Sequence, residues 1–372
     1  MRLAYISADP GIPYGGTKGA SVHLAEITEA LAAEDGEVLV LVTAVAPGNS
    51  PPCGVTVEAL PGPGKDASAT ERLGFQDELA AWLEGRLRDF GADAVYERFA
   101  LHSAAGGIVA QRLGIPHLVE LNAPLLEEAA RYRRLDEAGV AARIERATLS
   151  RAGLVLAVSP PLAGYAKARG ARRVEVLQNA AAIERFPRRE RDGVDPVAVF
   201  AGSLRPWHGL ETIAEAWRLL DGSAPPLLVV GDGPGRERLA EVAASVVGPV
   251  APSRIPELLA GADIGLAPYG ADAPRYFSPL KLFEYLAAGL ATVVADLPAV
   301  TAVVDRDAAV VIPRGDAVAL ADAVAALCAD PSERRRLGEN GRALVESAHT
   351  WRHRARRILA AAAELAPAEV GA

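Results

Sequence analysis

The segment 278–289 joins a lysine and a glutamate at the start of a predicted helix. Its pattern predicts Ser278 as the N-cap, Pro279 as the first helical residue and Gly289 as the terminator. Lys281 would then lie in the first turn, beside unpaired backbone N–H groups and the positive end of the helix dipole. That position disfavours a cation by up to about 1 kcal/mol, so we expect an anion to bind there.

Lys281 and Glu284 are three residues apart, so both project from one face of the helix. The arrangement suits a nucleoside diphosphate, with phosphates at the helix start and ribose hydroxyls on the carboxylate. A solvated surface pair on an amphipathic helix is the alternative, and this segment alone leaves both open. The residues expected to touch the ligand are Ser278, Pro279, Leu280, Lys281 and Glu284.

Composition is that of a globular protein: 372 residues, half of them hydrophobic, with a formal net charge of −8. The length predicts two or three domains. The negative charge argues against nucleic acid as a general partner, although basic segments occur at 131–134 and 352–357. Cys53 and Cys328 have neither disulfide-framework nor metal spacing, which fits a reducing cytoplasm.

The N-terminus runs directly into a strand pattern and lacks a signal-peptide core. No apolar run reaches the length of about 18 residues that a membrane span needs. We therefore expect a cytoplasmic protein without a membrane span, which leaves peripheral contact with a membrane open.

Short apolar runs alternate with helical patterns along the whole chain, which predicts an α/β fold of parallel sheets covered by helices. The first set of predicted strands is 3–7, 38–43, 55–60, 94–97, 117–121, 154–158 and 174–177. The second set is 197–201, 227–230, 245–250, 264–268, 292–295 and 309–312.

A charged, proline-bearing linker at 186–196 separates the two sets, so we place a boundary near residue 190. We expect one Rossmann-like, doubly wound domain over 1–186 and another over 187–349. A terminal helix over 350–372 is free to pack back on the first domain. Ligands bind at the carboxyl ends of such sheets, so we expect the site in a cleft between the domains.

Several segments resemble one family, the retaining glycosyltransferases of family 4, which have the GT-B fold of two such domains. The resemblance spans nearly the whole chain. It rests on Gly15 and Gly16 with a following helix, and on Phe186 and Pro187 after Asn179. It also rests on 200–209 (Phe-Ala-Gly-Ser-Leu-Arg-Pro-Trp-His-Gly), 229–234 (Val-Val-Gly-Asp-Gly-Pro) and 278–289.

The resemblance implies donor contacts from Gly15, Gly16, Ser203, Arg205, His208 and Gly231. The first loop is not a P-loop, because no Gly-Lys-Ser/Thr follows at the required spacing. Where many members carry arginine and lysine, this chain has Ser203 and His208. We expect Arg205 to supply the displaced charge. His208 would be cationic only when protonated.

Two further departures from the family concern the sugar and the linker. The family pairs two glutamates eight residues apart, but Tyr276 stands where the first is expected, while Glu284 matches the second. Recognition of the donor sugar therefore falls to other groups, for which Tyr276, Phe277 and the backbone around Ser278 are the candidates. Residues 179–182 read Asn-Ala-Ala-Ala in place of the common Asn-Gly-Val-Asp, and we assign them no chemistry.

On the acceptor side, polar residues follow strands of the first domain. We expect acceptor contacts from His23, Arg98, Glu120 and Asn122. His23 could equally be a core histidine. The residues expected to take part in catalysis are Arg205, Lys281, His102 and Asn122.

The resemblance implies transfer of a sugar from a nucleoside diphosphate donor, UDP favoured over GDP, to a hydroxyl of a small or lipid-linked acceptor with retention. We identify no Asp-x-Asp pair of the kind that would hold a catalytic metal, so we expect neither metal nor cofactor. Two alternatives stay open: a nucleotide-sugar epimerase or hydrolase of the same fold, and a non-catalytic nucleotide-sugar-binding protein.

Overall fold

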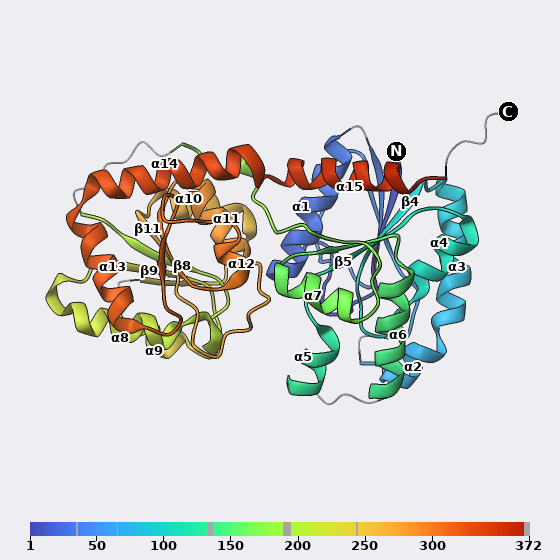
Figure 1. Ribbon diagram of the computed structural model, residues 1–372, viewed down its shortest axis with the longest axis horizontal. Coiled ribbons are helices and arrows are strands. Elements are labelled where there is room, and N and C mark those ends of the chain that lie inside the picture. Colours follow the sequence, from blue (N-terminus) through green and yellow to red (C-terminus); the bar gives the residue numbers. More distant parts are fainter. Residues whose placement is uncertain (35, 65, 133–136, 189–194, 243–244, 368–372) are drawn as a thin grey trace. The chain divides into compact units, whose positions relative to one another are not determined.

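The computed structural model describes residues 1–34, 36–64, 66–132, 137–188, 195–242 and 245–367 (Figure 1). Arg133 and Arg134 of the first basic segment, and the expected boundary near residue 190, lie outside these residues. The chain forms two compact units. The first unit is Met1–Gln178 with Trp351–Ala372, and the second unit is Asn179–Thr350.

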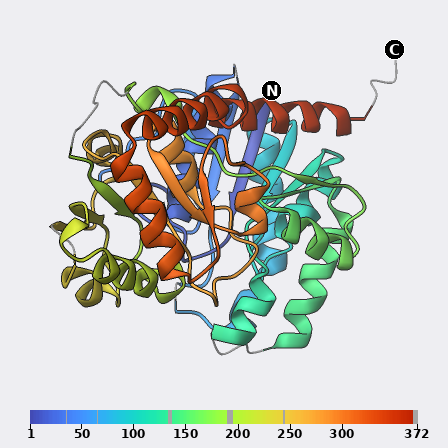
Figure 2. The ribbon, with the colours of Figure 1, turned by 60° about the vertical axis from the view of Figure 1, so that its left-hand side comes forward.

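The first unit is built on a seven-stranded parallel sheet, whose first strands are blue to cyan in Figure 2. Its strand order is β3-β2-β1-β4-β5-β6-β7. The strands are β1 (Arg2–Ser7), β2 (Glu37–Val42), β3 (Val55–Ala59), β4 (Ala94–Arg98), β5 (His117–Leu121), β6 (Leu154–Ala157) and β7 (Val174–Val176). The helices are α1 (Gly19–Ala33), α2 (Ala69–Gly74), α3 (Gln76–Phe90), α4 (Ala105–Leu113), α5 (Leu125–Tyr132), α6 (Ala138–Arg151), α7 (Pro160–Ala168) and α15 (Trp351–Leu365).

The second unit has a six-stranded parallel sheet in the order β10-β9-β8-β11-β12-β13. Its strands are β8 (Ala198–Ala201), β9 (Leu227–Val230), β10 (Ser245–Gly248), β11 (Ile264–Ala267), β12 (Ala291–Ala295) and β13 (Val310–Ile312). Its α-helices are α8 (Leu210–Leu220), α9 (Arg236–Ala240), α10 (Ile255–Ala260), α11 (Leu280–Ala287), α12 (Pro298–Thr301), α13 (Ala317–Ala329) and α14 (Pro331–Ala348). Short 3₁₀ turns lie at Ile183–Arg185, Pro206–His208, Asp221–Ser223 and Pro252–Arg254.

The predicted fold class is confirmed, since each predicted strand coincides with a strand of one of these two sheets. Sequence reasoning worked here because central parallel strands are covered on both faces and therefore read as continuous apolar runs. Strand β12, for example, is buried along its whole length.

Helix α15 belongs to the first unit, where it packs against α1. The basic segment at 352–357 supplies its ion pairs: Arg352 and Arg356 both bind Glu34, at 2.5 and 2.7 Å, and Arg357 binds Glu175. These arginines therefore hold a helix in place. No described helix has the length and apolar character needed to cross a membrane.

Residues 179–186 belong with the second unit. Ala181 and Phe186 lie in its hydrophobic core. The Ala181 N–H donates to the carbonyl of His349, 3.0 Å away. The chain enters this unit after Gln178 and leaves it before Trp351. These two segments pair through their backbones at Ala181 and Thr350.

Candidate functional site

Helix α11 begins at Leu280 with Pro279 as its N-cap, so the predictions of Ser278 as N-cap and of Pro279 as the first helical residue are both wrong. The Ser278 hydroxyl instead accepts a hydrogen bond from the Asn179 backbone N–H at 3.1 Å. No described residue accepts a hydrogen bond from the Leu280 or Lys281 backbone N–H. The first turn thus keeps the uncapped donors that favour an anion.

Gly289 ends the helix as predicted. It has φ +71°, and its N–H donates to Leu286 while the Leu290 N–H donates to Tyr285, both at 3.0 Å. This is the Schellman arrangement, which a glycine adopts without steric cost.

The Lys281 amine is buried and has no hydrogen-bond partner among the described residues. It lies 3.9 Å from the centre of the Phe200 ring and 5.9 Å from that of Tyr269. Burial lowers its pKa to about 7, against the opposing attraction of Glu284. Burial likewise raises the pKa of Glu284 to about 7, although Lys281 opposes it.

Burial thus disfavours the charged form of both side chains, so a ligand that binds these charged groups would stabilise them. An unpaired amine in an apolar pocket is costly, and a phosphate would compensate it directly. For the Lys281 amine, the free-energy cost of burial exceeds the unfavourable interaction with the helix dipole inferred from sequence, which amounts to at most about 1 kcal/mol.

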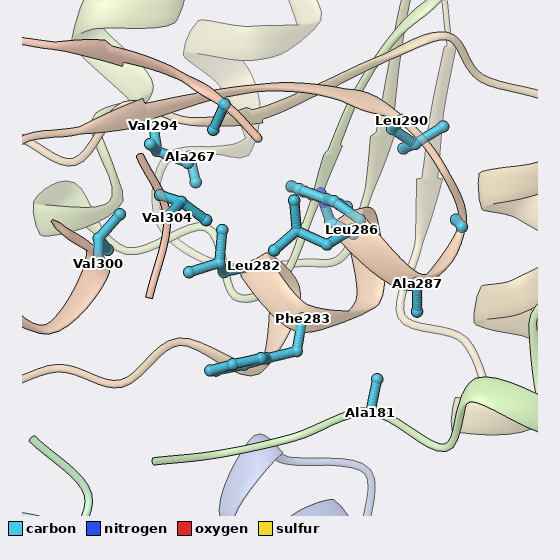
Figure 3. Packing of buried hydrophobic residues seen from close by; sticks show 14 of the residues in the cluster. Ala181, Ala267, Leu282, Phe283, Leu286, Ala287, Leu290, Val294, Val300 and Val304 are labelled. Atoms are coloured by element: carbon cyan, nitrogen blue, oxygen red, sulfur yellow. The ribbon is translucent and has the colours of Figure 1, made fainter. Parts of the chain in front are cut away.

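The residues that follow Lys281 in α11 pack into the hydrophobic core of the second unit. Leu282 and Leu286 face Val294 and neighbouring residues, whereas Phe283 faces the side of Ala181 (Figure 3). On the sheet side, the Tyr285 hydroxyl accepts the Ala201 N–H at 2.7 Å at the end of β8. The helix is therefore anchored to the strand whose loop meets the lysine.

That loop depends on glycine. A Cβ on Gly202 would lie 2.9 Å from the Lys281 amine. A Cβ on Gly231 would lie 2.0 Å from the Gly202 carbonyl oxygen, and Gly231 has φ +139°. Glycine at both positions lets the loops after β8 and β9 approach each other and the lysine.

Of the polar residues in the loop after β8, Arg205 is exposed and forms no ion pair with any described residue. The His208 Nδ1 lies 2.5 Å from the Ser203 carbonyl, so Nδ1 carries the proton and Nε2 is an acceptor. Burial, with help from Lys281 and Arg205, lowers the pKa of His208 to about 3. His208 is neutral at pH 7 and cannot supply the cationic phosphate contact considered from sequence.

Tyr269, which sequence reasoning did not assign to the site, lies beside this loop. Tyr269 stacks edge-on against His208, with 5.7 Å between the ring centres, and contacts Phe277, which in turn contacts Tyr276. Tyr269 also has φ +35°, a strained conformation for a bulky residue. The available signal was its place directly after a predicted strand.

In the first unit, the structure brings the predicted acceptor residues together around Glu120. Its carboxylate binds His23 Nε2 at 2.8 Å, Tyr96 Oη at 2.6 Å and Arg98 at 2.7 Å, and accepts the amide N–H of Asn122. We call these five residues the Glu120 cluster. Tyr96 is the member that the sequence did not identify.

The cluster is a preorganised charged network. Burial alone would raise the pKa of Glu120, but His23, Arg98 and Tyr96 lower it to about 2. Asn122 is the half-exposed member, and the other four are buried. Since its N–H group binds Glu120, the Asn122 carbonyl oxygen is left to accept a hydrogen bond from a ligand.

The remaining predicted residues of this unit lie apart from the cluster's hydrogen bonds. Gly15 has φ +73°, and the Asn49 side chain fills the space where its Cβ would be. Gly16 packs in the same way against Ser21. His102 lines a separate hollow of about 500 Å³ at the carboxyl edge of the sheet. Burial and the charge of Arg72 lower the pKa of His102, which keeps it neutral.

Metal ligands do not converge in the described part of the chain, where no group of three or more His, Cys, Asp or Glu could hold an ion. One Asp-x-Asp pair, Asp305 and Asp307, does occur. It precedes β13, where Asp307 binds Arg336 at 3.3 Å and is largely exposed. This pair is not among the residues that we find around Lys281.

Two family models match the chain. The model for "Glycosyl transferases group 1" matches residues 195–330, and the model for a "Glycosyl transferase 4-like domain" matches residues 18–180. No curated protein matches the chain.

Solved structures match over nearly the whole chain. Sucrose-phosphate synthase from Thermosynechococcus elongatus is 19% identical with a TM-score of 0.76, covering 98% of both chains. Anabaena Alr3699/HepE in complex with UDP is 17% identical with a TM-score of 0.73, covering 98% of this chain and 100% of that one. WaaG, a glycosyltransferase involved in lipopolysaccharide biosynthesis, is 19% identical with a TM-score of 0.70, covering 96% and 99%. At sequence identities of 17–19%, the similarity to these structures shows a shared fold and no more.

Proposed function

We propose, from the premise that this chain belongs to the group 1 glycosyltransferases of the GT-B fold, that it transfers a sugar from a nucleoside diphosphate sugar to an acceptor hydroxyl with retention of configuration. The observation that carries this proposal is the buried amine of Lys281, unpartnered among the described residues, at the uncapped start of α11. A diphosphate provides the anion that both the amine and the first-turn N–H groups lack.

In the proposed reaction, the bond between the anomeric carbon and the diphosphate oxygen breaks while charge grows on the diphosphate. Lys281 and Arg205 stabilise that charge. The acceptor oxygen bonds to the anomeric carbon on the face that the diphosphate leaves, and the hydroxyl proton passes to the diphosphate. Glu284 holds the ribose hydroxyls, and the neutral His208 accepts a hydrogen bond from a hydroxyl of the donor.

For the nucleotide we favour UDP over GDP. The Anabaena structures that share the fold are described as complexes with UDP and with UDP-glucose, which supports this choice. On the acceptor side we assign binding to the first unit, with Asn122, oriented by Glu120, and His102 as the contacts. The acceptor is a small or lipid-linked molecule that bears a hydroxyl.

The proposal is tested by Glu284→Gln, which keeps the shape of the side chain and removes its charge. Losing charge-assisted hydrogen bonds to the ribose should lower kcat/KM for the UDP-sugar about 10- to 150-fold. UDP affinity, measured by isothermal titration calorimetry, should fall with it.

Stability separates this effect from unfolding. The raised pKa of Glu284 means that its charge costs stability increasingly as pH rises from 4.5 to about 7, so the variant should melt no lower than wild type at pH 8. Glu215→Gln, an exposed glutamate of the same unit, is the matched control. Unchanged UDP affinity in a folded Glu284→Gln protein would contradict the ribose assignment.

A second prediction concerns metal ions. We expect transfer to continue in excess EDTA, because Lys281 and Arg205 supply the positive charge that a divalent ion supplies in metal-dependent enzymes. Initial rates of UDP release are compared with chelator, and then with added Mg²⁺ or Mn²⁺. Complete loss of activity followed by rescue would show that a metal is required.

A further inference from the structure

Asn179 precedes α11 by about a hundred residues in the chain, yet it binds the residue immediately before the helix N-cap. Its backbone N–H donates to the Ser278 hydroxyl at 3.1 Å, and its side-chain amide donates to the Ser278 carbonyl. Asn179 is 7% exposed, so these bonds form in a largely dry environment.

The bond from the Asn179 backbone N–H occupies a hydroxyl that would otherwise compete with the ligand, and the side-chain bond holds the Ser278 carbonyl beside it. A serine at a helix start is among the best capping residues, because its oxygen accepts an N–H of the first turn. Here the Ser278 hydroxyl is turned to Asn179, and α11 has no side-chain cap. The N–H groups of Leu280 and Lys281 consequently have no acceptor among the described residues.

We propose that Asn179 is a positioning residue of the donor site: it holds Ser278 away from the capping position, so that the first turn of α11 stays open for the donor diphosphate. The inference rests on the proposed function of that turn. It gives a role to a segment, 179–182, whose sequence indicated none.

The test measures UDP binding by isothermal titration calorimetry in wild type, Asn179→Ala, Ser278→Ala and the double variant. Asn179→Ala keeps the backbone N–H that binds the Ser278 hydroxyl but removes the side-chain bond to the Ser278 carbonyl, which holds the two segments together. Once this anchor is lost, we expect the Ser278 hydroxyl to turn to the first turn of α11. Since a side-chain cap is worth about 0.5–2 kcal/mol, UDP binding should weaken roughly 2- to 30-fold. In the Ser278→Ala background no hydroxyl is left to cap the helix. There the same Asn179→Ala change should weaken binding less than 2-fold, a coupling that the double-mutant cycle isolates.

Asn340→Ala is the matched control, because the Asn340 amide also donates to a backbone carbonyl of this unit, that of Asp307, at 2.9 Å. It should leave UDP affinity unchanged. An Asn179→Ala protein that melts lower but binds UDP as wild type does would overturn the proposal. So would an equal loss of affinity whether residue 278 is serine or alanine.

Lys281→Met in the same titration separates this inference from the proposed function. If Lys281→Met and Asn179→Ala both bind UDP normally, the donor site itself has been misplaced. If Lys281→Met loses binding while Asn179→Ala does not, the donor site stands and the role of Asn179 is refuted.

Discussion

Lys281→Met is expected to make the ligand-free protein more stable and the enzyme much slower. The methionine keeps most of the side chain but removes an amine that is buried against Phe200 without a hydrogen-bond partner among the described residues. Burial lowers the pKa of the amine from 10.5 to about 7, so its charge costs stability that the methionine does not carry. Because the proposed role of the amine is to stabilise the leaving diphosphate, sugar transfer should slow about 100- to 1,000-fold.

The pH dependence of the stability gain identifies its cause. The pKa of Lys281 is near 10.5 in the unfolded chain and about 7 in the folded protein. The cost of its charge is therefore fully present below pH 7 and declines as pH rises towards 10.5. Thermal melting of the two proteins should differ most at pH 6 and less at pH 9.

Lys167→Met is the control, since Lys167 is an exposed lysine of α7 and should change neither property appreciably. UDP release under single-turnover conditions gives the rate, and melting without ligand gives the stability. A Lys281→Met protein that loses stability and keeps its rate would place this lysine outside the donor site.

Glu120→Gln is expected to destabilise the first unit by about 3–5 kcal/mol, because it leaves the buried guanidinium of Arg98 without its counter-charge. The glutamine amide would also face donors from His23 and Tyr96. Urea unfolding followed by tryptophan fluorescence measures the loss, and the residual folded protein should show weaker acceptor binding because Asn122 loses its orientation.

The stability of the wild-type protein should include a contribution from Glu120 that is lost in acid and that this variant lacks. Since the cluster lowers the pKa of Glu120 from 4.5 to about 2, its contribution is present above pH 4.5 and is lost as pH falls towards 2. The matched control is Glu58→Gln, which breaks a partly exposed pair with Arg86 in the same unit and should cost no more than about 1 kcal/mol. Equal losses of stability in the two variants would mean that the Glu120 cluster contributes no more than a partly exposed ion pair.

The sequence by itself determined the two parallel sheets and helix α11 with Lys281 in its first turn and Gly289 at its end. It also identified most of the Glu120 cluster as candidates, although it could not show that they meet. These features were predictable because they depend on local patterns: apolar runs for buried strands, and terminator chemistry for a helix.

Only the tertiary structure decided which partner each polar group takes. Ser278 does not cap α11, because its hydroxyl accepts a hydrogen bond from a backbone N–H that is 99 positions away in the chain. His23 binds Glu120 across 97 positions, and His208 is neutral because the fold buries it beside two cations. Hydrogen bonding and desolvation act over a few ångströms in space, and one sequence without its fold does not specify those distances.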